Sequence, residues 1–218
     1  MERYFILDKY NTWAEWDLIL TAKDITPPEP KTNYVNIDGS HGTLDLSESL
    51  TGEITYNDRT ITASFWTCEG SRAEREIKLK QIICLLHGRK VKIVEPDDLN
   101  HYFYGRIKIG NVKNILSYAE FTLEAICEPW RYSINDVVHS FTVVNNSPVS
   151  AAIHNNGVKT VCPTLTVAGS PSITYDGVTM PLSQGTYKIP DLKLYRGVNI
   201  ISITGDGSIA ITYKEADL

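Results

Sequence analysis

The sequence lacks the short motifs that usually mark a catalytic or metal site. Its 218 residues contain no CxxC pair, no HxH or HExxH pair and no GxSxG motif. Zinc sites, metalloprotease sites and serine-nucleophile elbows depend on these spacings. We therefore predict no catalytic residue, no cofactor and no metal, and we expect a protein that is not an enzyme.

Long apolar runs and an excess of positive charge are also missing. The first residues, MERYFILDKY, contain four consecutive apolar residues before Asp8, whereas a signal peptide needs roughly 7–15. No apolar run approaches the roughly 20 residues of a membrane span. The formal net charge of −5 argues against a surface for nucleic acid. We expect a soluble protein made in the cytoplasm.

The four cysteines, Cys68, Cys84, Cys127 and Cys162, match no zinc spacing. Free cysteine is among the residues most often found in protein interiors. We expect four reduced and mostly buried thiols.

Strand patterns dominate the first part of the chain. Glu53–Trp66 is rich in β-branched and aromatic residues. Arg89–Gly110 reads as a hairpin whose turn is Pro96-Asp97-Asp98, and Ser117–Cys127 alternates again. Asp97 and Asp98, followed by His101, could form an acid–base pair, but carboxylates at a hairpin tip are more simply turn formers.

One segment, Ser71–His87, has the pattern of a helix. Ser71 and Glu74 form a capping-box signature, and Gly88 stands where a helix usually ends. Four apolar residues recur at the spacing of one helical face: Leu79, Ile82, Ile83 and Leu86. The opposite face, with Arg72, Glu76 and Lys80, should be solvated or contact a partner.

The composition changes near Cys127–Val137. Beyond it, charges become sparse and short strands follow one another, separated by turn residues such as Asp176-Gly177 and Gly205-Asp206-Gly207. This spacing favours an antiparallel sandwich. We predict a mainly β protein with two domains, residues 1–132 and 133–218, the first with a single helix and a β-hairpin and the second a β-sandwich.

The glycine-rich segment Asn36–Gly52 raises the question of a phosphate loop. Such a loop opens onto a helix and usually carries a lysine, whereas Gly39 and Gly42 lead into an alternating, extended stretch. We predict a turn at the two glycines, a short extended arm and a second turn at Gly52. His41, without a nearby histidine or cysteine, is read as a turn residue. Leu44 and Leu46 should dock on the sheet or on a neighbouring subunit.

Several blocks follow one another along the first part of the chain: Pro30 to Val35, DGSHGTLDLSESLTG (38–52), YNDR (56–59), LLHG (85–88), YFYGRI (102–107) and EPWRY (128–132). Taken in this order, they resemble the distal tail proteins (Dit) of bacteriophages with long, non-contractile tails. The resemblance covers about residues 1–132, and His41 departs from it because the family's arm usually has Asp there.

The resemblance implies a ring, typically a hexamer, at the distal end of the tail tube. It also implies two β-sandwich-like domains: the first, with the helix and the hairpin, builds the ring, and the second, galectin-like, projects outward. The implied location is the virion tail tip. Implied partners are other copies of the chain, the tail tube protein, the tail-tip hub and receptor-binding parts; no nucleic-acid binding is implied beyond genome passage through the ring. The helix, the hairpin and the arm are the candidate ring contacts: Leu44, Leu46, Arg72, Glu76, Lys80, Tyr102, Tyr104 and Arg106.

A second hypothesis is a carbohydrate-binding β-sandwich that attaches to cell-surface glycan. Its motivation is the all-β second half of the chain. The four tryptophans weaken it, because none lies beyond Trp130, and exposed aromatic rings are what such modules use to stack on sugars.

Overall fold

A computed structural model describes residues 4–218, and it confirms a mainly β fold. By its internal contacts the chain forms two compact units. The N-terminal unit comprises the chain up to Arg131 together with Leu218, and the C-terminal unit comprises Tyr132–Asp217. Among residues 4–218, no helix has the length and apolarity needed to cross a membrane.

The N-terminal unit is built on one sheet, with strand order β2-β1-β7-β8-β9-β6-β3. All the pairings with a defined register are antiparallel. The predicted hairpin is confirmed: β7 and β8 pair across a turn at Pro96 and Asp97, with Glu95 opposite Asp98. The strands are β1 (Ile6–Leu7), β2 (Tyr10–Asn11), β3 (Ile19–Ile25), β6 (Arg59–Thr67), β7 (Lys90–Glu95), β8 (Asp98–Asn114) and β9 (Ala119–Ser133).

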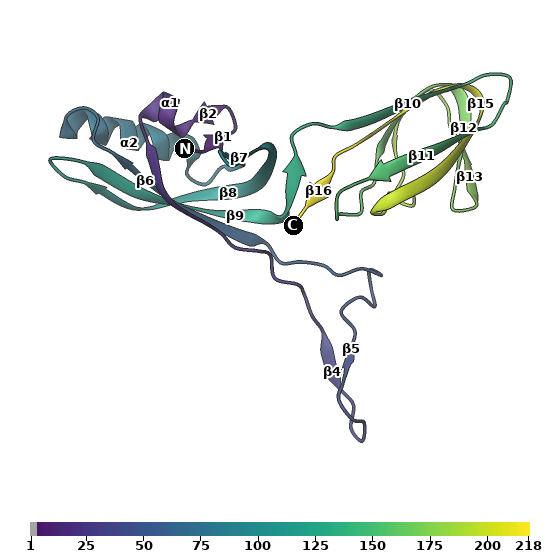
Figure 1. The fold of residues 1–218 in the computed structure, drawn as a ribbon, viewed down its shortest axis with the longest axis horizontal. Helices are drawn as coiled ribbons and strands as arrows, with labels where there is room; N and C mark the ends of the chain where they lie inside the picture. The colour runs from purple at the N-terminus through teal and green to yellow at the C-terminus, as the bar shows by residue number, and fades with distance from the viewer. Residues whose placement is uncertain (1–3) are drawn as a thin grey trace. The chain divides into compact units, whose positions relative to one another are not determined.

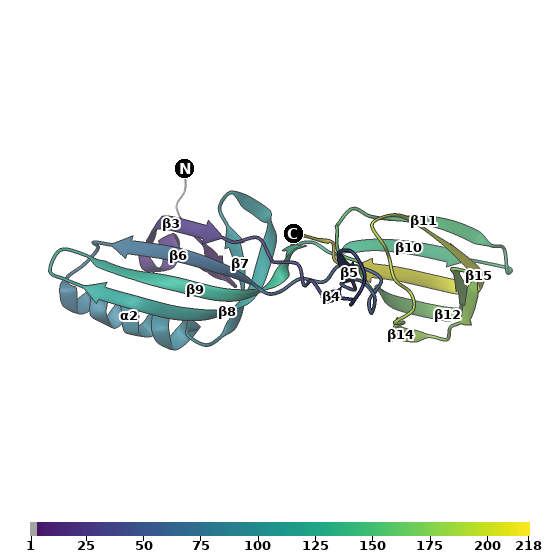
Figure 2. The same cartoon turned by 90° about the horizontal axis from the view of Figure 1, so that it is seen from below.

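The predicted helix is confirmed as α2 (Arg72–Leu86), which runs along one face of this sheet (Figure 2). Both halves of the capping box are present, since Glu74 N–H donates to Ser71 Oγ and Ser71 N–H donates to the Glu74 carboxylate. Leu79, Ile82 and Leu86 are buried in the core, while Ile83 is partly buried against it. The core therefore lies between α2 and the alternating inner side chains of β6, β8 and β9.

Gly105, the glycine of the YFYGRI block, allows β8 and β9 to pack closely. A Cβ at this position would lie 2.3 Å from Cys127 Sγ and 2.6 Å from the Ile126 carbonyl oxygen. No side chain fits in that space. Burial also raises the pKa of the Cys127 thiol to about 12.

A second, short helix, α1 (Thr12–Trp16), adds to the one that we predicted. Its N-cap is Asn11, whose side-chain oxygen accepts from the N–H groups of Trp13 and Ala14. Asp17 ends it in the left-handed region with φ of 54°. Five residues are too few for a periodic apolar pattern, which is why the sequence did not reveal this helix.

The segment between β3 and β6 forms the predicted arm, a hairpin of β4 (Tyr34–Asn36) and β5 (Thr43–Asp45). Figure 1 shows it extending from the sheet of its own unit. Gly39, Gly42 and Gly52 have φ values of 82°, 78° and 73°, so the predicted turns are confirmed. Each needs a conformation that glycine adopts without a steric penalty.

The C-terminal unit is a curled sheet with strand order β10-β15-β12-β13. Two more strands join this sheet: β11 pairs with β15, and β14 pairs with β12. A short strand, β16 (Ala216–Asp217), closes the chain. The other strands are β10 (Val137–Val143), β11 (Val149–Asn155), β12 (Thr164–Tyr175), β13 (Val178–Pro181), β14 (Gly185–Lys188) and β15 (Gly197–Tyr213).

Two of these strands are longer than the sequence suggested. In the sequence, the residues on the two sides of Gly169 resemble two separate short strands, but they are the two halves of β12. In the same way, the residues on the two sides of Gly205–Gly207 are the two halves of β15. The three glycines have φ of 87°, 94° and 143°, so the strands bend there while they remain paired from Thr164↔Thr212 to Thr174↔Ser202. Both halves contribute to a single core, as in a sandwich.

The expectation of mostly buried cysteines is wrong. Cys127 is buried, Cys162 is half-buried, and Cys68 and Cys84 are exposed, all four as free thiols. Cys68 follows the last residue of β6 into a loop, and Cys84 lies on the outer side of α2.

Candidate assembly surfaces

The arm exposes most of its apolar side chains. Val35 lies opposite Leu44 across the hairpin, and these side chains are 39% and 47% exposed. Leu50 is 98% exposed and Leu46 is half-buried. We expected Leu44 and Leu46 to dock either on the chain's own sheet or on a neighbouring subunit. Leu44 does not dock on the chain's own sheet, because it is exposed.

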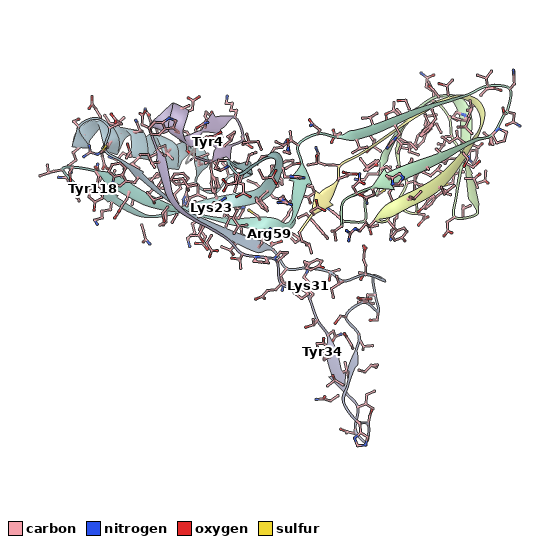
Figure 3. The ribbon with its side chains drawn as sticks, viewed as in Figure 1. Tyr4, Lys23, Lys31, Tyr34, Arg59 and Tyr118 are labelled. Atoms are coloured by element: carbon pink, nitrogen blue, oxygen red, sulfur yellow. The ribbon has the colours of Figure 1, made fainter. Side chains whose placement is uncertain are left out.

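Hydrogen bonds within the arm hold its shape. Leu46 N–H donates to the Asn33 carbonyl at 2.8 Å, and Asn33 N–H donates to Ser47 Oγ at 2.9 Å. The Asp45 carboxylate accepts from the Ser47 hydroxyl and N–H, and these bonds, with one from Tyr34, lower the pKa of Asp45. Figure 3 shows Tyr34 on the arm and Lys31 nearer its base. Hydrogen bonds within the arm thus fix its conformation, while most of its apolar side chains remain exposed.

The outer face of α2 is exposed, as predicted for Arg72, Glu76 and Lys80. Glu76 forms an ion pair with Lys80 at 3.5 Å and accepts from Asn114 Nδ2 at 3.1 Å. The hydrogen bond from Asn114, followed by the charge of Lys80, lowers the pKa of Glu76. Ile77, on the same side of the helix, is 58% exposed. This face combines charges with one uncovered apolar side chain.

The hairpin residues Tyr102, Tyr104 and Arg106 differ in how much surface they offer. Tyr102 is only 9% exposed, and Lys92 Nζ lies 4.8 Å from its ring centroid. Tyr104 is half-buried beneath Lys90, and Arg106 is exposed while Nη1 donates to the Gly88 carbonyl. Tyr104 and Arg106 are therefore the better candidates for contact with another molecule.

Sequence reasoning missed Arg75, which organises one end of the N-terminal unit. It is only 2% exposed, although it lies on a helix. Its guanidinium donates to the carbonyls of Gly70, Ile115 and Leu116, and Nε donates to Asn114 Oδ1. Arg75 thus joins the start of α2 to the turn between β8 and β9. In the sequence, only its position four residues before Leu79 and seven before Ile82, which places it on the buried face of the helix, hints at burial.

The histidine and the carboxylate near the tip of the β7–β8 hairpin, His101 and Asp98, pair with each other. His41 lies exposed on the arm. His101 Nδ1 lies 2.8 Å from Asp98 Oδ2, and Asp98 also pairs with Arg131 at 3.2 Å. Asn100 N–H donates to the same carboxylate, as expected of a turn former. Within residues 4–218, no three His, Cys, Asp or Glu side chains are placed to hold a metal ion.

The fold as a whole is that of a distal tail protein. The crystal structure of the SPP1 Dit (gp 19.1) protein, described as a paradigm of the hub adsorption apparatus in phages that infect Gram-positive bacteria, matches this chain with a TM-score of 0.69. The match covers 97% of this chain and 98% of that one, at 15% sequence identity.

Comparisons of sequence alone do not detect the similarity to the SPP1 Dit protein. No protein-family profile matches the chain, and no curated protein is detectably similar to it in sequence. The predicted resemblance to distal tail proteins is therefore confirmed at the level of the fold, and it extends beyond the first 132 residues to nearly the whole chain.

Proposed function

We propose that this chain is a structural component of a phage tail tip. Copies of it form a closed ring of six that joins the tail tube to the distal hub and to the adsorption apparatus. The observation that carries the proposal is the match in fold to the SPP1 Dit protein over 97% of the chain. That protein is described as part of a hub adsorption apparatus.

The exposed arm supports self-assembly. The hairpin leaves Val35, Leu44 and Leu50 exposed, although its polar groups form hydrogen bonds within the arm. Because these apolar side chains are not buried, they add little to the stability of the subunit. Apolar side chains on a projecting segment are instead typical of a contact with another chain. In the proposed ring, Leu44 and Leu46 dock on the neighbouring subunit.

A ring needs two different surfaces that complement each other. The outer face of α2, with Arg72, Glu76 and Lys80, and the hairpin face, with Tyr104 and Arg106, supply charged and aromatic groups on opposite sides of the sheet. Tyrosine and arginine are enriched at interface cores. Tyr102 contributes by supporting the hairpin from within the unit, because it is already buried.

The role is mechanical, and the chain acts without catalysing a reaction. The ring works at the virion tail tip, with the tail tube protein and the tail-tip hub as axial neighbours and receptor-binding parts at its periphery. Nucleic acid contacts it only in passing, because the DNA crosses the central channel.

The first test measures the mass of the purified chain in solution by light scattering and images it by negative-stain electron microscopy. We expect a species of six chains and closed rings with a central hole. Leu44→Asp should shift the chain towards monomer, because a charge placed in an apolar contact costs several kcal/mol when it is desolvated. The matched control is Val178→Asp, which changes an exposed apolar residue of the C-terminal unit.

A strictly monomeric wild-type chain at high concentration would contradict the proposal. So would a ring that Leu44→Asp and Val178→Asp weaken equally, because the arm would then have no special part in assembly.

A further inference from the structure

The C-terminal unit contains a pocket of about 430 Å³ that the assembly role does not use. This volume lies within the roughly 300–1,000 Å³ typical of small-molecule sites. Every residue that lines it belongs to the C-terminal unit. Thr164 pairs with Lys188 on β14 and with Thr212 on β15, so these three side chains form one row on the same face of the sheet.

Positive charge gathers at this pocket. The C-terminal unit has five lysine and arginine side chains, and three of them, Lys159, Lys188 and Lys214, line the pocket. One carboxylate, Asp136, faces them. The chain as a whole carries a net charge of −5. A local excess of cations in an acidic protein indicates a site for an anion.

Two of the three lysines are held in place by neighbouring groups. Lys214 Nζ pairs with Asp136 at 2.8 Å and donates to the carbonyls of Ser133 and Ile134 at 3.0 and 2.9 Å. Lys159 Nζ donates to Tyr132 Oη at 2.9 Å and lies 4.7 Å from the centroid of that ring. Their charges are therefore fixed before any ligand arrives, which lowers the entropy cost of binding.

The third lysine is available to a ligand. Within residues 4–218, the Lys188 ammonium group has no hydrogen-bond or ion-pair partner, and it is exposed at the edge of the pocket. It has three N–H groups to donate. The hydroxyls of Thr164 and Thr212 lie in its row and can bind the polar groups that accompany an anion.

We propose that this pocket binds a small anionic ligand: a phosphate ester or a carboxylate carried by a hydroxyl-bearing group such as a sugar. Lys188 donates to the anion, Lys159 and Lys214 stabilise its charge, and the threonines contact its hydroxyls. A neutral sugar fits less well, because Lys159 already occupies a face of the Tyr132 ring and the unit has no tryptophan. This inference goes beyond the proposed function and does not depend on ring formation.

The test is isothermal titration calorimetry of the full chain with glucose 6-phosphate, glucuronate and glucose. We expect saturable binding of at least one of the two anions, weakened by added salt, and no binding of glucose. Lys188→Gln should weaken binding about tenfold, as expected for the loss of one charge-assisted hydrogen bond. Lys193→Gln, a change of an exposed lysine outside the pocket, should leave it unchanged.

Three results would overturn the inference. The first is that neither anion binds at millimolar concentration. The second is that glucose binds as well as its anionic derivatives. The third is that Lys188→Gln, with an unchanged circular dichroism spectrum, binds like the wild type. If binding follows the expected pattern, the ratio of the two anion affinities identifies the preferred group, and the mass of the wild-type chain reports separately on the ring.

Discussion

Among residues 4–131, two arginines are buried, and their surroundings differ. The Arg75 guanidinium donates to four backbone carbonyls and to one side-chain amide. Arg59 is 5% exposed, lies over the Phe103 ring at 5.1 Å, and has two nitrogens, Nε and Nη2, that are buried without a hydrogen-bond partner. Burial, aided by the like charge of Arg131, lowers the pKa of Arg59.

This contrast predicts opposite effects of the same substitution. Arg75→Met should lower the free energy of unfolding by at least about 3 kcal/mol, because several buried carbonyls lose their donors. Arg59→Met should leave stability unchanged or raise it, because methionine removes an unpartnered buried charge and still packs on Phe103. Urea unfolding followed by tryptophan fluorescence measures both, since all four tryptophans lie in the N-terminal unit. Equal destabilisation by the two changes would contradict this account.

At the scale of elements, the bends in β12 and β15 let the C-terminal unit form a sandwich from a few long strands. Gly207 has φ of 143°, and a Cβ there would lie 2.1 Å from the Ala168 carbonyl oxygen. The bend therefore requires a residue without a side chain. Gly177, in the turn between β12 and β13, has φ of 76° but no atom within 4 Å of a Cβ.

We expect Gly207→Ala to destabilise the C-terminal unit by about 2–3 kcal/mol, from backbone strain and the displaced strand. Gly177→Ala should cost about 1 kcal/mol, because the left-handed conformation is its only penalty. Thermal unfolding followed by far-ultraviolet circular dichroism checks both values. A Gly177→Ala variant as unstable as Gly207→Ala would show that close packing at the bend is not the cause.

At the scale of the whole molecule, the two units have separate cores. One is built around Phe65, Ile82 and Leu123, and the other around Leu165, Ile203 and Ile211. Each buries its own apolar face, which is what independent folding requires.

We therefore predict that the two units unfold independently. Gly207→Ala should move the circular dichroism transition of the C-terminal unit to lower urea concentration and leave the tryptophan transition in place. Arg75→Met should do the reverse. Residues 132–217 expressed alone should give a dispersed ¹H–¹⁵N spectrum. A single transition that both substitutions shift together would show instead that the units fold as one.

Features that depend on local chemistry could be predicted from the sequence. The capping box at Ser71, the turn at Pro96 and Asp97, and the glycine turns of the arm follow from hydrogen bonds and φ values within a few residues. The alternation in β6 and β9 likewise follows from burial of one face of a sheet. Local patterns of this kind also supported the resemblance to distal tail proteins, which the fold confirms.

Features that depend on residues far apart in the chain could not be predicted from the sequence and became visible only in the folded protein. The sequence shows Gly205 and Gly207 as turn residues, and only continued pairing with β12 shows that they bend a strand. Arg59 cannot be told from a surface arginine until its neighbours are known, and the partners of Arg75 are likewise visible only in the structure. The pocket residues Thr164, Lys188 and Thr212 lie far apart in the sequence, and strand register brings them together, because a sheet aligns residues by pairing rather than by their order in the chain.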